Sequence, residues 1–269
     1  MRFRYIIIFG ASLIIFSSCK KYLDLKPDKA IAVPSTIKDL QALLDNTERM
    51  NENNPAWGLD CIDDYYMPQD IYTNEMGFQE KLAYTWDRLQ YASYPNDWAF
   101  IYNHVYLANV ILEGIETVQK TASNQVDWDN VKGSALVFRS QAFLRAIFLF
   151  SKAYDESSAK QEYGIVLRLS SDFNEKSVRS SQQESYDRIL DDLKEAANLL
   201  PDRPFHVMRP SKNAAYALLA RAYLSMRKYD SAFKYADLSI KVNSNLLDYN
   251  DFDPNSNFQF KRFNSEIIF

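Results

Sequence analysis

Apolar side chains recur every three or four residues along several stretches of this chain, which is the spacing of one face of an α-helix. These stretches cover residues 36–46, 98–118, 131–154, 181–200, 211–226 and 229–242. Each has polar residues on its other positions, so each is expected to bury one stripe against a neighbour. We therefore predict an all-α fold.

Local signals indicate where several of these helices begin and end. Ser35 is expected to cap the first helix. Ser181 and Glu184 have the spacing of a capping box, and Pro201 is expected to stop the helix that they begin. Residues 159–174 lack helical spacing and are expected to form an extended connection.

The last two helices are separated only by Arg227 and Lys228 and alternate large and small side chains as in a tetratricopeptide repeat. The matching positions are Tyr216, Leu219, Ala220 and Tyr223, followed by Tyr229, Ala232, Ala236 and Ser239. Small residues let two helices cross closely, and the large ones fill the space beside the crossing. Because one helix pair cannot bury its face alone, we predict stacked pairs in an α–α superhelix. An irregular, loop-rich insertion is expected near residues 51–97.

The amino terminus has a different pattern. Arg2 and Arg4 precede an apolar run, residues 6–16, which is shorter than the ~20 residues that span a membrane and is typical of a signal peptide. Ser17, Ser18 and Cys19 follow and resemble a lipobox.

From this pattern we expect a lipoprotein signal peptide at 1–18, a lipid anchor on Cys19, a tether at 19–34 and a helical domain from 35 to 269. An ordinary secretory signal with an incidental cysteine is the alternative.

Composition narrows the function classes. The net charge is −4 and no basic block is present, so nucleic-acid binding is not expected. Once Cys19 is acylated, Cys61 has no partner for a disulfide. The only histidines are His104 and His206, and the sequence shows no partners that would complete a zinc site or a Ser-His-Asp triad with them. His104 is expected to be a hydrogen-bonded helix residue. We predict no metal and no cofactor.

Aromatic residues make up 14% of the chain and are concentrated in residues 84–98. They can cap the helices, as Trp98 in particular can, or stack on the faces of sugars. The candidate ligand-binding residues in this stretch are Trp86, Arg88, Tyr91, Tyr94 and Asn96. The neighbouring carboxylates Asp63 and Asp64 are adjacent in sequence and point in different directions, so they do not predict a catalytic pair.

Six stretches, taken in order, resemble the SusD/RagB family of nutrient-binding outer-membrane lipoproteins. They are SSCKKYLDLKP, DWAFIYNHVYLANVIL, AFLRAIFLF, SYDRILDDLKEAANLLP, SKNAAYALLARAYLSMRKYDSAFKYAD and NSEIIF. The resemblance implies tetratricopeptide helix pairs with an irregular ligand-facing subdomain. It also implies a non-enzymatic, surface-exposed protein, lipid-anchored in the outer membrane, that passes a glycan or peptide to a SusC-like TonB-dependent transporter.

The chain departs from the family pattern in two places. It stops at Phe269, directly after NSEIIF, so we expect the domain to be truncated before the ligand-facing later half. Residues 157–172 also differ from the usual proline-rich stretch. Two other function classes stay open, which are a tetratricopeptide protein-interaction scaffold without small-ligand binding and a secreted glycan hydrolase. The pattern does not identify the ligand.

Overall fold

The helices of this chain occur in the order that the apolar spacing predicts. A computed structural model describes residues 34–55, 57–88, 96–256 and 258–269. Its elements are α3 (Ile37–Leu44), η1 (Glu48–Glu52, a π-helix), α4 (Trp57–Asp60), α5 (Gln69–Asn74), α6 (Phe78–Tyr84), α7 (Asp97–Glu116), α8 (Gln125–Phe150), β1 (Tyr163–Val166), β2 (Arg179–Ser181), α9 (Gln182–Leu199), α10 (Lys212–Ser225), α11 (Tyr229–Val242) and η2 (Tyr249–Asp251, a 3₁₀ turn).

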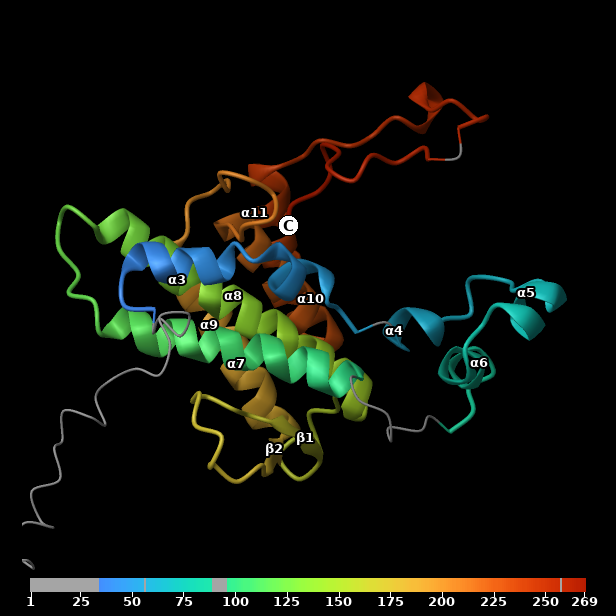
Figure 1. The fold of residues 1–269 in the computed structure, drawn as a ribbon, viewed down its shortest axis with the longest axis horizontal. Coiled ribbons are helices and arrows are strands. Elements are labelled where there is room, and N and C mark those ends of the chain that lie inside the picture. The colour runs from blue at the N-terminus through green and yellow to red at the C-terminus, as the bar shows by residue number, and fades with distance from the viewer. Residues whose placement is uncertain (1–33, 56, 89–95, 257) are drawn as a thin grey trace, which may run out of the picture. The chain divides into compact units, whose positions relative to one another are not determined.

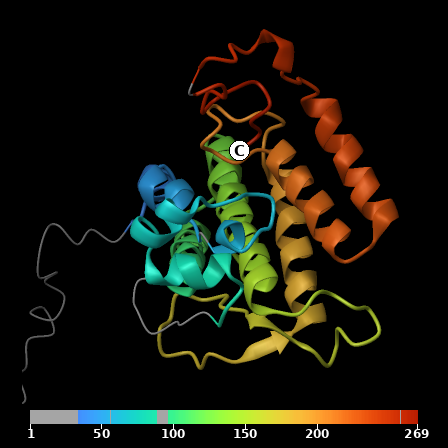
Figure 2. The same cartoon turned by 90° about the vertical axis from the view of Figure 1, so that its right-hand side faces the viewer.

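The longest helix, α8, lies at the centre of the packed helices (Figure 1). It packs against α7 and α3 on one side and α9 on the other, and α10 then packs on α9 and α11 on α10. Figure 2 shows α8, α9, α10 and α11 in succession, from green to red. The helix α8 is long and apolar enough to cross a membrane, but most of it is buried in the core. The prediction of packed helix pairs is confirmed.

Two hydrophobic clusters make up the core of the described residues. One joins α7, α8, α9 and α10; its large, fully buried side chains include Ile101, Phe143, Ile189, Leu193 and Leu219. The other joins α3 and η1 to α7 and α8 and includes Leu40, Met50 and Ile111. Both clusters use residues of α7 and α8, so this helix pair connects the two halves of the core.

The helix boundaries confirm some local signals and correct others. Ser181 and Glu184 form the capping box, with the Ser181 amide donating to Glu184 Oε2 at 2.8 Å. The first helix is capped by Thr36 rather than Ser35, because the Thr36 hydroxyl accepts from the Asp39 amide at 3.1 Å. The central helix α8, predicted at residues 131–154, begins earlier, at Gln125, and ends earlier, at Phe150.

The predicted extended connection contains the short strand β1, which pairs antiparallel with β2. This two-stranded sheet is an addition to the all-α prediction. It forms because the chain after α8 must return along the start of α9, where paired strands satisfy backbone groups.

The α10–α11 pair keeps part of the predicted alternation of large and small side chains. The ring of Tyr223 stacks on Tyr235 with centroids 5.6 Å apart, and Tyr216 lies 6.1 Å from the same ring. Tyr229, the predicted filler, is 64% exposed. Tyr229 therefore does not fill the space beside the crossing, contrary to the repeat pattern.

Three parts of the prediction lie wholly or almost wholly outside the described residues. They are the signal peptide at 1–18, the anchor Cys19 and the tether at 19–34. The insertion at 51–97 is described in part, and there it contains the short helices α4, α5 and α6 rather than loops alone. In Figure 1 the helices α5 and α6 lie apart from the packed helices α7 to α11.

Candidate functional site

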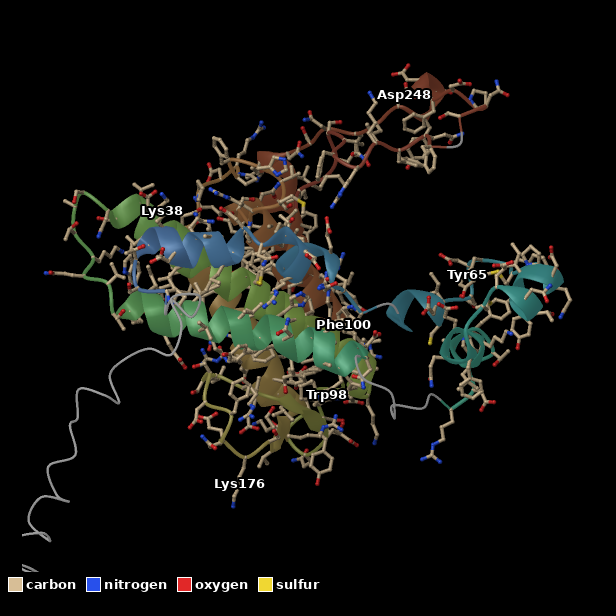
Figure 3. All side chains as sticks on the ribbon, in the orientation of Figure 1. Lys38, Tyr65, Trp98, Phe100, Lys176 and Asp248 are labelled. Carbon is tan, nitrogen blue, oxygen red and sulfur yellow. The ribbon has the colours of Figure 1, made fainter. Side chains whose placement is uncertain are left out.

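A hollow of about 240 Å³, called here the α7 groove, lies between the first half of α7 and the β1–β2 loop (residues 167–178). From α7 it is lined by three aromatic residues spaced four apart, which are Trp98, Tyr102 and Tyr106. The loop adds Arg168, Ser170, Ser171, Asp172, Phe173 and Ser177. Figure 3 shows Trp98 at the amino-terminal end of α7, on the side of β1 and β2, and Lys176 at the outer edge of the loop.

Hydrogen bonds from α7 hold the β1–β2 loop in place. The buried Asn109 donates its Nδ2 hydrogens to the carbonyls of Arg168 at 2.9 Å and Ser170 at 3.1 Å. One turn further along, Glu113 accepts from the amide of Ser171 at 2.7 Å and also from its hydroxyl. Burial acts to raise the pKa of Glu113, but the hydrogen bonds from Ser171 outweigh it and lower that pKa. The carboxylate form therefore holds the loop.

A buried ion pair connects this anchor to the core. Arg139 on α8 donates from Nη1 to Oδ1 of Asn109 at 3.0 Å. Its Nε and Nη2 donate to the two carboxylate oxygens of Asp192 on α9 at 2.8 and 2.9 Å. A bidentate guanidinium–carboxylate pair has a defined geometry, so it orients the amide of Asn109 towards the loop.

The hydroxyl of Tyr102 is fully engaged by the strand that leads into the loop. It donates to the carbonyl of Val166 at 3.0 Å and accepts from the amide of the same residue at 3.1 Å. Burial raises the pKa of Tyr102 to about 12, so the phenol stays neutral. The ring of Trp98 lies 4.5 Å from that of Tyr102 and 5.0 Å from that of Phe150, measured between centroids.

The outer end of the groove is formed by Tyr106 and Phe173, whose ring centroids are 4.8 Å apart. Phe173 is an aromatic residue among polar loop residues, and it is 74% exposed. An exposed ring at the edge of a hollow has a free face that can stack on the C–H face of a sugar. The hydroxyls and charged groups of the loop are suitable partners for sugar hydroxyls.

The groove holds charged and hydroxyl groups beside its aromatic rings. Backbone and side-chain hydrogen bonds from Asn174 lower the pKa of Asp172, which keeps this carboxylate ionised. Within the part of the chain that the structure describes, no three His, Cys, Asp or Glu side chains are grouped so that they could hold a metal ion. The arrangement can orient a polar ligand against aromatic rings.

The predicted ligand-binding residues occupy the segment before α7. Trp86 is 67% exposed and has a left-handed backbone with φ of 54°, and its Nε1 donates to the Cys61 carbonyl at 2.8 Å. Arg88 is exposed. Asn96 caps α7, where its side-chain oxygen accepts from the amide of Ala99 at 3.1 Å. Tyr91 and Tyr94 lie outside the described residues.

The structure brings together a different set of residues from the predicted one, since Trp86 and Arg88 do not line the α7 groove. The β1–β2 loop and Tyr106 were not among the predicted ligand-binding residues. One signal was present, because Phe173 stands within the polar run SSDFN, where an aromatic ring has no local packing partner. The ring of Trp98 packs at the start of α7, as expected if this residue caps the helix.

Comparison with known proteins identifies the family. A family model named SusD-like and described as starch-binding and associating with the outer membrane matches residues 21–224, which is most of the chain. No protein of curated function matches it.

Solved structures share the fold at low sequence identity. A putative sugar binding protein from Bacteroides vulgatus is 19% identical with a TM-score of 0.65, and the match covers 78% of this chain and 47% of that chain. A SusD superfamily protein from Bacteroides fragilis is 17% identical with a TM-score of 0.65, covering 81% and 52%. A laminarin-binding SusD-like protein is 17% identical with a TM-score of 0.56, covering 78% and 44%.

This chain thus spans about half the length of these structures. At such identities the likeness concerns the fold alone, while the match to the family model covers residues on all the helices from α3 to α10. The chain therefore belongs to the SusD-like family.

Proposed function

We propose that this protein is a lipid-anchored, glycan-binding protein of the outer membrane that delivers its ligand to a SusC-like TonB-dependent transporter. SusD-like binding proteins are non-enzymatic, which agrees with the absence of a catalytic pattern in the sequence. The description of the family refers to starch and to the outer membrane, and one similar structure is described as laminarin-binding. A glycan is therefore the ligand class that these similarities favour over a peptide.

The observation that carries the proposal is the α7 groove. Its aromatic rings, above all the exposed Phe173, lie next to the polar groups of a loop that is held by Asn109 and Glu113. A held loop loses little conformational entropy when a ligand binds. The predicted residues of the preceding segment, Trp86, Arg88, Tyr91, Tyr94 and Asn96, remain a second proposed set of ligand contacts, because this segment leads directly into the start of α7 in the sequence.

The test is binding of the purified protein to soluble starch, laminarin and a mixture of casein peptides, measured by isothermal titration calorimetry. We expect binding to a glucan. Phe173→Ala should weaken it about fivefold to tenfold, the effect of losing one aromatic contact of about 1–1.5 kcal/mol. Trp86→Ala tests the preceding segment in the same way.

A matched control is Phe205→Ala, because Phe205 is also exposed but lies outside the groove. Unfolding temperatures of all variants show whether each remains folded. If Phe173→Ala and Phe205→Ala bind glucan as tightly as the unaltered protein, the groove is not the site. If only casein peptides bind, the ligand class is wrong.

A protein-interaction scaffold is the second candidate, and the outer side of α11 favours it. Tyr229, Phe233 and Ile240 are exposed there at helical spacing. On this alternative the protein binds none of the three ligand preparations, whereas Phe233→Glu abolishes the capture of a partner protein from envelope extracts.

The anchor is tested separately at Cys19. We expect Cys19→Ala to prevent the incorporation of labelled palmitate and to release the protein from the membrane fraction, because the thiol is the proposed acylation point. Stable retention needs more than one acyl chain. A Cys19→Ala protein that is still labelled and membrane-bound would show that the anchor lies elsewhere.

A further inference from the structure

Two guanidinium groups near the carboxyl-terminal segment have no carboxylate partner among the residues that the structure describes. Arg145 on α8 is partly buried and donates only to the side-chain oxygen of Asn54. Arg221 on α10 makes no hydrogen bond or ion pair within the described parts of the chain. Burial, together with the nearby charge of Arg221, lowers the pKa of Arg145 to about 10. The two positive charges therefore repel each other without compensation.

The space around these groups is an open groove made of two adjoining hollows of about 230 and 240 Å³. We call it the arginine groove. Arg145 lines one hollow and Arg221 the other, and both hollows share Gln141, Ile267 and Phe269. The rest of the second hollow is largely apolar and includes Ala217 and Leu218. The first hollow is mixed, with the polar Asn51 and Asn54 beside Met208 and Phe263.

The other charged and polar groups of the groove do not neutralise the two arginines. Arg262 is paired with Glu52. Glu266 lines the second hollow, but its carboxylate accepts from the amide of Leu247 at 2.7 Å and makes no ion pair with Arg221. The side-chain oxygen of Asn51 is buried without a donor in the described residues, although its Nδ2 donates to the carbonyl of Met208 at 3.2 Å.

Unpaired charge in a partly dry site is costly, and a carboxylate removes that cost by forming a charge-assisted hydrogen bond with a guanidinium. The charge of Arg221 adds to the attraction for the same carboxylate, so one carboxylate serves both arginines. The apolar side chains of the hollow beside Arg221 suit an aliphatic side chain rather than a hydrated free ion. The charges and the lining of the groove therefore suit a ligand that has an acidic group next to an aliphatic one.

We infer that the arginine groove binds a peptide segment carrying an acidic side chain. Its carboxylate pairs with Arg145 and is attracted by Arg221, while a neighbouring aliphatic side chain occupies the hollow beside Arg221. The arginine groove shares no lining residue with the α7 groove, so this interaction is independent of ligand binding there.

The test uses the full chain and an acetylated, amidated pentapeptide with one glutamate between two leucines. The matched peptide has glutamine in place of glutamate, and glutarate serves as a free carboxylate. Binding is measured by calorimetry at low salt. We expect the glutamate peptide to bind at least about tenfold more tightly than the glutamine peptide, since the ion pair is worth more than about 1.4 kcal/mol.

The variants distinguish the contribution of the two arginines to binding from the effect of the overall charge of the protein. Arg145→Gln and Arg221→Gln should each weaken binding of the glutamate peptide, the first more than the second. Lys160→Gln, at an exposed lysine without a described ion pair, should leave it unchanged. Because Arg221 is exposed, its substitution tests the inference even if Arg145→Gln fails to fold.

Three outcomes overturn the inference. The first is equal affinity for the glutamate and glutamine peptides, or no binding of either. The second is unchanged binding in Arg221→Gln. The third is binding of glutarate as tight as that of the glutamate peptide, which would show a site for free anions rather than for a peptide segment.

Discussion

His104 is a titratable residue placed where its charged form is unfavourable. It is buried in α7, and its Nε2 atom has no hydrogen-bond partner in the described residues. Burial first, and then the charge of Arg145, lower its pKa to about 4, while a hydrogen bond to the Arg49 backbone partly opposes this. The expectation of a fully hydrogen-bonded histidine was therefore wrong for Nε2, because the packing of η1 over α7 leaves that atom without a donor.

The lowered pKa predicts how stability depends on pH. In the unfolded chain the histidine binds a proton below about pH 6.5, but in the folded chain only below about 4. Between these values the unfolded state binds more protons, so stability falls as the pH is lowered from about 6.5 to 4. The total effect is roughly 3 kcal/mol.

Urea unfolding at pH 7, 5.5 and 4.5 measures this effect. His104→Gln should flatten the dependence in this window, whereas His206→Gln, at a loop position outside α7, should not. Equal slopes for the unaltered protein and His104→Gln would contradict the prediction.

At the scale of the elements, the close approach of β1 to the start of α9 depends on a glycine. A Cβ atom at position 164 would lie 2.1 Å from the Ser185 hydroxyl oxygen and 2.4 Å from the Ser181 carbonyl oxygen. Backbone cannot move aside as a flexible side chain can. The strand therefore approaches the helix only because residue 164 is Gly.

We expect Gly164→Ala to lower the free energy of unfolding by about 1–3 kcal/mol, since it overpacks this contact. Gly58→Ala is the control, because a Cβ there would meet Leu149 at an ordinary 3.5 Å. Chemical denaturation compares the two. A Gly164→Ala protein as stable as the control variant would show that β1 can shift away without cost.

The packing of α10 against α9 and α11 gives a second prediction at the scale of the elements. Ala222 is fully buried on α10, whereas Ala220, which the repeat pattern places at a crossing, is only partly buried. Ala222→Leu should therefore cost about 1–3 kcal/mol and Ala220→Leu less. Denaturation midpoints of the two variants test the order, and the reverse order would favour the repeat pattern over the observed burial.

Across the whole molecule, one buried network links the core to the candidate site. Arg139 connects Asp192 on α9 to Asn109 on α7, and Asn109 holds the β1–β2 loop. Arg188 also donates to Asp192, at 3.1 Å. These contacts predict that a change at Arg139 alters how firmly the β1–β2 loop is held.

Arg139→Met should cost about 3–5 kcal/mol, because it leaves the Asp192 carboxylate buried without its bidentate partner. The double variant with Asp192→Leu should recover much of this stability. Hydrogen exchange of the amides at 168–173 should be faster in both, since Asn109 loses its orienting partner in each. Unchanged exchange in the double variant would show that Asn109 holds the loop without Arg139.

Much of the fold was determined by the sequence itself. Apolar residues at helical spacing placed the long helices, because such a stripe is buried only in a helix. The capping box at Ser181 and Glu184 was also predictable from the sequence, because its hydrogen bonds join residues only three positions apart. The resemblance to the SusD/RagB family rested on the order of such segments, and the family match agrees with it.

Only the tertiary structure decided which side chains meet. The α7 groove joins Tyr106 to Phe173, and the loop anchor joins Asn109 to Ser170, in both cases across long separations in the chain that leave no periodic signal. Whether a charge is paired is likewise a long-range property. Arg139 finds Asp192 on another helix, while Arg145, from the same helix, finds no carboxylate in the described chain. Periodicity reports which face of an element is buried, but the partner on that face is set by how the helices pack.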